Sequence, residues 1–353
     1  MQNRFFRRLA ALAALPLAAA ACDGDGPDEP RIIERLALTV NSVENSLSLV
    51  PVDGGSGTQA RAVGLGAQGT PVGVAARGAY AVVPMGTYPF AAVVNLRTST
   101  LTTRVALPAG SGATGAEFVN DSIAVVANPA LNSVTPVNVL RGTAGAQVLV
   151  GTYPQAVVSD GARAYVLNGN LVNFAPAGPG SVTVLDGQLR LVKTVQLSGL
   201  NPSAAAFVGN RLYVLNAGSF GGNNGSLSVV NLQTLSEESH HTGFGNYPSS
   251  IAASATGELY VGIYGTGIVV WNPETRTFRV PLASPLTPGG SGIVSGIGFG
   301  PAGRLHTVNP GTCQTPGVMN RLTGDAVVDR TVTVGICPFG LAFAEVPEAE
   351  EDE

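Results

Sequence analysis

The feature that most constrains the fold is a unit of about 45 residues that recurs along the chain. It is clearest between Asn201 and Leu232, where two runs rich in Val, Leu and Ser each end at an Asn. In successive units the corresponding run ends at Asn41, Pro84, Asn128, Asn168, Asn216, Ile263 and Asn309. The spacing varies only from 40 residues (Asn128 to Asn168) to 48 residues (Asn168 to Asn216). Asn suits the end of a strand because it tolerates left-handed backbone and its amide can bond its own turn.

Each unit contains four strand-like segments. The first is short, rich in small residues, and follows a proline in four units, namely Pro154, Pro202, Pro248 and Pro338. The second and third segments are apolar throughout, which is typical of strands that are buried on both faces. The fourth segment is more polar, as a strand at an outer rim would be. Four strands per unit at this spacing are typical of a β-propeller, and seven units predict seven blades.

The first unit lacks its first strand. Residues 339–344, which follow Pro338 near the other end of the chain, have the composition of the missing strand. We therefore predict an all-β fold, a seven-bladed β-propeller with four antiparallel strands per blade. In this fold the C-terminal strand completes the first blade and closes the ring, which removes an open sheet edge.

Two strand ends carry a Tyr-Val-x-Asn signature, AYVLN at residues 164–168 and LYVLN at residues 212–216. With the GTYP turn at 151–154 and the SVTVLD run at 181–186, the unit resembles the YVTN-repeat family of bacterial β-propellers. The resemblance covers roughly the whole propeller region, 35–345. It implies an exported or cell-surface propeller with a binding role.

The N-terminus resembles a bacterial lipoprotein signal. Three arginines between residues 4 and 8 precede an apolar run from Leu9 to Ala21, which is too short to span a bilayer. Cys22 follows at once and would become the lipidated first residue of the mature chain. Plain secretion, with cleavage after the small residues that end at Ala21, is the alternative. Either route exports the protein, and the first makes it a membrane-anchored lipoprotein of the bacterial envelope, in the periplasm or on the cell surface.

These observations divide the chain into four parts. We expect a signal peptide at 1–21, a flexible acidic linker at 22–34, the propeller at 35–345 and a disordered acidic tail at 346–353. The formal net charge is −4, and much of the acidity lies in the linker and the tail. The propeller region is close to neutral and has no basic patch, so we expect no nucleic-acid partner.

One face of the predicted propeller gathers the candidate binding residues. Loops that join second to third strands, and loops that join blades, share a face, and functional residues concentrate on such loops. The aromatic residues expected there are Tyr88, Tyr153, Phe174, Phe220, Tyr247 and Tyr264. The alternative for Tyr153 and Tyr247 is that they only pack between blades as part of a repeated x-Tyr-Pro turn.

Two cysteines are expected on the same face. Cys313 lies in a loop of the seventh unit, and Cys337 directly precedes the closing strand. In an exported chain such a pair predicts a disulfide, which here would fasten the ring closure. A redox or metal-binding pair is disfavoured because the chain has no Cys-x-x-Cys motif and no nearby cluster of histidines.

No catalytic motif stands out, and we expect no catalytic residue and no cofactor. His240 and His241 are adjacent on a strand, so their side chains point to opposite faces and cannot bind one metal together. His306 lies in a strand interior and is expected in the core. Glu117, on an inner strand, is the one carboxylate that could hold a metal at the central channel. Its alternative role is a structural ion pair with an arginine.

The sequence therefore favours a lipid-anchored propeller that binds an envelope protein or a small ligand without catalysis. One alternative is a lactonase-like, metal-dependent hydrolase that uses Glu117, since propeller lactonases resemble this fold. Another is a structural protein of the cell envelope.

Overall fold

The structure of the protein is a computed structural model that describes residues 31–55 and 57–349. The predicted signal peptide, the lipidation site Cys22 and most of the linker lie outside the described residues, as do the last four residues of the tail. The described chain is built of strands, with two single 3₁₀ turns, η1 (Pro129–Leu131) and η2 (Pro288–Gly290). None of its helices is long and apolar enough to cross a membrane.

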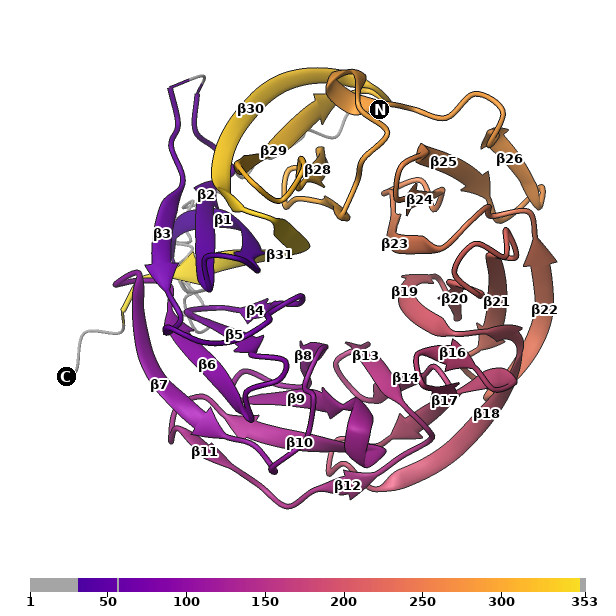
Figure 1. Ribbon diagram of the computed structural model, residues 1–353, viewed down its shortest axis with the longest axis horizontal. Coiled ribbons are helices and arrows are strands. Elements are labelled where there is room, and N and C mark those ends of the chain that lie inside the picture. Colours follow the sequence, from indigo (N-terminus) through magenta and orange to yellow (C-terminus); the bar gives the residue numbers. More distant parts are fainter. Residues whose placement is uncertain (1–30, 56, 350–353) are drawn as a thin grey trace, which may run out of the picture. The chain divides into compact units, whose positions relative to one another are not determined.

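Residues 32–349 form seven antiparallel sheets in a ring around a common axis, which confirms the predicted fold (Figure 1). From the innermost to the outermost strand, blade 1 is β31 (Pro338–Pro347), β1 (Ile32–Asn41), β2 (Ser46–Pro51) and β3 (Arg61–Gly64); blade 2 is β4 (Ala75–Arg77), β5 (Tyr80–Pro84), β6 (Phe90–Asn95) and β7 (Thr100–Ala106); blade 3 is β8 (Ala116–Phe118), β9 (Ile123–Asn128), β10 (Ser133–Asn138) and an outer strand in two pieces, β11 (Thr143–Ala144) and β12 (Val148–Leu149). Blade 4 is β13 (Pro154–Ser159), β14 (Ala164–Asn168), β17 (Pro179–Leu185) and β18 (Leu191–Leu200); blade 5 is β19 (Pro202–Val208), β20 (Arg211–Asn216), β21 (Ser226–Asn231) and β22 (Ser236–Thr242); blade 6 is β23 (Pro248–Ala253), β24 (Leu259–Ile263), β25 (Gly267–Asn272) and β26 (Thr277–Val280); blade 7 is β27 (Gly296–Phe299), β28 (Leu305–Asn309), β29 (Pro316–Thr323) and β30 (Val327–Ile336).

The ring closes where the two ends of the described chain meet. Strand β31 pairs with β1 along its length, from Asn41 opposite Pro338 to Ile32 opposite Pro347. The propeller is therefore longer than predicted, since residues 32–34 were assigned to the linker and residues 346–347 to the tail. The physical reason is burial, because Val346 has no exposed surface.

The core is divided among the gaps between blades. Seven clusters of buried apolar residues lie between neighbouring blades, one in each gap. Consecutive residues of a middle strand serve different gaps: Leu212 packs against blade 4, and Tyr213 packs against blade 6. Both faces of the middle strands are thus buried, which explains their continuous apolar runs.

The recurring Asn at the second strand ends has a different role from the predicted one. Asn168 is buried, and its Nδ2 donates to Ser181 Oγ at 3.1 Å and Thr183 Oγ1 at 3.0 Å on the neighbouring strand β17. Asn41, Asn128 and Asn216 make the same kind of bond to β2, β10 and β21. None of these four has left-handed backbone. The amide therefore ties the second strand to the third instead of closing its own turn.

The predicted disulfide joins Cys313, in the loop between β28 and β29, to Cys337, directly before the closing strand β31. It links blade 7 to blade 1 across the ring closure. The bridge encloses 24 residues, and a loop of this length stabilises the folded state by on the order of 3 kcal/mol in the chain-entropy model.

We expect Cys313→Ser to lower the free energy of unfolding by that amount, measured as the shift of the urea midpoint. A reducing agent should lower the midpoint of the unchanged protein to the value of the variant, and should leave Cys313→Ser/Cys337→Ser unaffected. An unchanged protein that does not respond to reduction would contradict a stabilising bridge.

Candidate functional site

The two faces of the ring differ in charge. We call loop face the side that carries the connections from second to third strands and the connections between blades. Backbone hydrogen bonds join these two sets of loops, for example Gly169 N to Tyr153 O at 2.8 Å and Ala217 N to Asn201 O at 2.9 Å. Of all residues in these connections only Glu44 is charged. The turns of the opposite face hold many arginines and carboxylates, among them Asp53, Arg97, Asp121, Arg141, Asp160, Arg163, Arg190, Glu258, Glu274, Arg276, Arg304 and Asp325.

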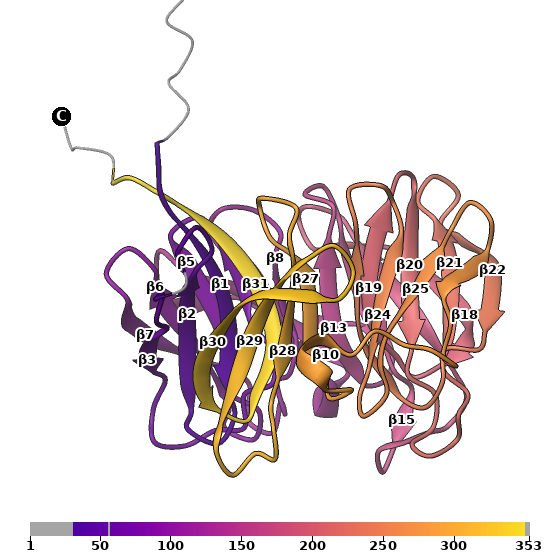
Figure 2. The ribbon, with the colours of Figure 1, turned by 90° about the horizontal axis from the view of Figure 1, so that it is seen from above.

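A short hairpin projects from the loop face at blade 4 (Figure 2). Its strands β15 (Leu171–Val172) and β16 (Ala175–Pro176) are joined by Asn173 and Phe174, both with left-handed backbone at φ 51° and 63°. Such two-residue turns favour Asn and then Gly, because a side chain in this conformation is strained. Phe174 stands in the glycine position, and 83% of its surface is exposed. A strained and exposed aromatic residue suggests a functional constraint.

A second exposed aromatic residue lies on the next blade. Phe220, in the loop between β20 and β21, is 86% exposed. Its loop is held by hydrogen bonds on both sides of it: Ser219 N donates to Asn224 Oδ1 at 2.8 Å, and Gly221 N donates to Asn246 Oδ1 at 2.9 Å. Phe220 is thus presented to solvent by an ordered loop.

Each exposed phenylalanine meets one of the tyrosines of the x-Tyr-Pro turns. The rings of Tyr153 and Phe174 are edge-on with centroids 6.2 Å apart, and those of Phe220 and Tyr247 are edge-on at 5.7 Å. Partial burial raises the pKa of Tyr153, with a smaller contribution from Tyr247. We call these four residues the aromatic quartet. Both tyrosines are only half-buried, so they are not confined to packing between blades.

The other two candidate residues lie apart on the same face. Tyr88 is 37% exposed in the β5–β6 loop and Tyr264 is 48% exposed in the β24–β25 loop. Neither contacts another aromatic ring among the described residues. The structure therefore brings four of the six predicted residues together and leaves two as single aromatic side chains.

Near the axis, the inner strands keep part of their surface exposed, which in the middle of a ring means that water reaches them. Glu117 on β8 accepts a hydrogen bond from the backbone N–H of Phe118 at 2.8 Å. Burial raises the pKa of Glu117 to about 7, against the smaller opposing effects of that bond and of Arg77. The expected ion pair with an arginine is not found, because Arg77 pairs with Asp121 at 2.6 Å. Within residues 31–55 and 57–349, no three His, Cys, Asp or Glu side chains lie close enough to bind a metal.

The histidines occupy three different environments. His240 is exposed, whereas His241 packs against Trp271 with ring centroids 5.2 Å apart, which corrects the expectation that both lie free on the surface. His306 is fully buried, as predicted. Its Nδ1 lies 3.0 Å from Arg304 O, so this nitrogen carries the proton and donates, and burial lowers the pKa of His306 to about 4.

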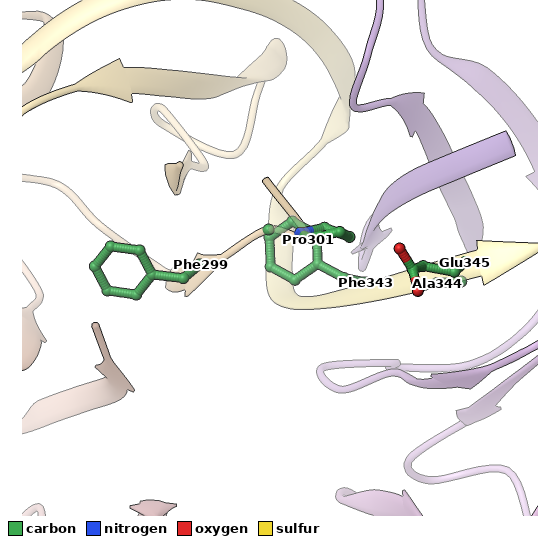
Figure 3. A pocket seen from close by; sticks show the side chains of 6 residues that line it. Phe299, Pro301, Phe343, Ala344 and Glu345 are labelled. Carbon is green, nitrogen blue, oxygen red and sulfur yellow. The ribbon is translucent and has the colours of Figure 1, made fainter. Parts of the chain in front are cut away.

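Where blades 7 and 1 meet, a pocket of about 350 Å³ lies beside the inner strands (Figure 3). Its walls are Phe299, Gly300, Pro301, Phe343, Ala344 and Glu345. Glu345 accepts a hydrogen bond from Arg35 at 2.9 Å and is the one ionisable group in the lining. A single carboxylate already held by an arginine offers no second group for acid–base chemistry.

No family model matches the chain, and a search of curated proteins finds no match. Among solved structures, the chain is similar to one described as a functionally unknown protein from Desulfotomaculum acetoxidans DSM 771. The TM-score is 0.65 at 15% identity, over 89% of this chain and 99% of the other. It is also similar to a chain of Kuenenia stuttgartiensis hydrazine synthase, with a TM-score of 0.50 at 15% identity, over 68% of this chain and 92% of that one. At this identity the similarities show the propeller fold alone.

Proposed function

We propose that the protein is an exported, lipid-anchored β-propeller that binds a component of the cell envelope with its loop face and performs no catalysis. The observation that carries this proposal is the aromatic quartet, in which two phenylalanines exposed by more than four-fifths are presented on ordered loops. Exposed aromatic anchors on a rigid scaffold are typical of binding surfaces.

The position of the chain ends supports this orientation. The described chain enters at Ile32 and leaves after Pro347 on the side opposite the β15–β16 hairpin (Figure 2). Cys22 precedes Ile32 by ten residues, which span at most about 35 Å when extended. An anchor at Cys22 would hold the opposite face toward the membrane, and the aromatic quartet would then point away from it.

The test is retention on envelope fragments from the cells that make the protein. A Cys22→Ser chain, which cannot be lipidated, should sediment with the fragments, and the added pair Phe174→Gly and Phe220→Ala should leave most of it in solution. Phe174→Gly is not expected to lower the melting temperature, because glycine is the preferred residue of this turn. Leu140→Gly provides the matched control, since Leu140 is 65% exposed in a turn of the opposite face. Equal retention of all three chains would contradict the proposal.

A further inference from the structure

The proposed function leaves the chemical nature of the ligand open, and a groove beside Phe220 addresses it. The groove has a volume of about 390 Å³ and lies between the end of β18 and the loop and outer strand of blade 5. This volume is near the lower end of the range for small-molecule sites, roughly 300–1,000 Å³. Its polar walls come from Ser198, Asn223, Asn224, Ser226, His240 and Thr242.

No carboxylate, ammonium or guanidinium group lines this groove. Several of its polar groups are available to a ligand. Asn223, with left-handed backbone at φ 51°, makes no side-chain hydrogen bond to another described residue. Asn224 uses its Oδ1 to accept from Ser219 N, which leaves its Nδ2 to donate. The hydroxyl of Ser198 is already engaged, since it donates to Glu237 Oε2 at 2.7 Å.

Phe220 belongs to the same loop as Asn223 and Asn224, so an apolar ring stands next to free amide groups. A sugar ring needs this combination, because its hydroxyl groups exchange hydrogen bonds with amides and hydroxyls while its C–H face packs on an aromatic ring. A neutral sugar needs no charged partner, and the loop face offers only Glu44.

Other ligand classes fit the loop face less well. Nucleic acids and anionic lipid surfaces are bound by clustered Lys and Arg, and the loop connections contain neither. Protein interfaces are enriched in Arg beside the aromatic residues, and the aromatic quartet has no such neighbour within the loop connections. The absence of charge over a whole face is the property that singles out an uncharged polar ligand.

Resting on the proposed function, we infer that the envelope component bound by the loop face is a neutral saccharide chain. One sugar unit occupies the groove, hydrogen-bonded by Asn223 and Asn224, and Phe220 packs against the ring of that unit or of its neighbour.

Affinity electrophoresis of the purified protein tests this inference, in gels that contain dextran, laminarin or mannan as neutral polysaccharides and polygalacturonate as an anionic one. At least one neutral polysaccharide should retard the protein, and polygalacturonate should not. Phe220→Ala and Asn223→Asp should each raise the apparent Kd about tenfold or more. Phe174→Gly removes the other exposed ring without touching the groove and should change the Kd much less. The retardation should persist from about 50 mM to about 500 mM salt, because no ion pair takes part.

The inference is overturned if none of the neutral polysaccharides retards the protein, if Phe220→Ala binds as well as the unchanged chain, or if salt abolishes the retardation. Its failure is distinguishable from a failure of the proposed function. If envelope retention still depends on Phe174 and Phe220 while no neutral polysaccharide binds, the loop face binds another class of molecule. If neither assay responds to these variants, both proposals fail.

Discussion

A chain that ends before Pro338 is expected not to fold. It loses strand β31, the inner strand of blade 1, and with it the buried Ala344 and Val346 and the partly buried Phe339 and Phe343. Each large apolar side chain contributes about 1.5–3 kcal/mol when it is buried. Their sum approaches the whole free energy of unfolding of an ordinary domain, about 5–15 kcal/mol. The loss also leaves β1 as an unpaired sheet edge.

The measurement is thermal unfolding followed by circular dichroism, with two control truncations. Removal of 350–353, which lie outside the described residues, should leave the melting temperature unchanged. Removal of 345–353 should lower it, because Val346 is fully buried and Arg35 loses its partner Glu345. A synthetic peptide of residues 338–347 added to the longest truncation should restore cooperative unfolding. Equal melting temperatures for all truncations would contradict ring closure by β31.

The number of blades could be predicted from the sequence because the repeat states it directly. The role of the Asn residues could not, because it depends on the pairing of two strands. Asn168 lies opposite Ser181 across β14 and β17, and only this register brings the amide to the Ser181 and Thr183 hydroxyls. A signal was present, since third strands begin with two hydroxyl residues at alternate positions, as in Ser46 and Ser48.

The candidate site was predictable in part for a similar reason. Topology alone places loops on a shared face, so Phe174 and Phe220 could be assigned to it from their strand neighbours. Their contacts with Tyr153 and Tyr247 depend on loop geometry, such as the hydrogen bond from Gly221 N to Asn246 Oδ1. No periodic pattern encodes such a bond. The absence of charge on the loop face is visible in the sequence, but only once every loop has been assigned to a face.

Opposed pH effects are expected from the two strongly shifted buried groups. Burial lowers the pKa of His306 from 6.5 to about 4, so its contribution to stability is complete above pH 6.5 and is lost as the pH falls toward 4. Burial raises the pKa of Glu117 from 4.5 to about 7, so its contribution is complete below pH 4.5 and is lost as the pH rises through 7. Between pH 6.5 and 4.5 the two changes have opposite signs. Each amounts to about 2 kcal/mol once the residual solvation of the groups is considered.

The stability of the unchanged protein should therefore vary little between pH 6.5 and 4.5, and single substitutions should reveal the two slopes. We expect Glu117→Gln to be more stable than the unchanged chain at pH 8, since no charge is then buried, and to lose about 2 kcal/mol as the pH falls to 4.5. His306→Tyr places the residue found at the equivalent positions 165, 213 and 260 and should gain stability over the same interval.

Urea midpoints at pH 8, 6.5 and 4.5 give these slopes, and because the slope is the readout, a difference in packing between variants does not affect the conclusion. Carboxylates whose pKa is lowered by ion pairs, such as Asp325 and Asp329, lose their contribution only below about pH 4 and do not enter the interval. Parallel pH profiles for the unchanged protein and Glu117→Gln would show that Glu117 titrates normally. The inner strands would then leave it open to water, and its position near the axis would not hold a neutral carboxyl group at pH 6.5.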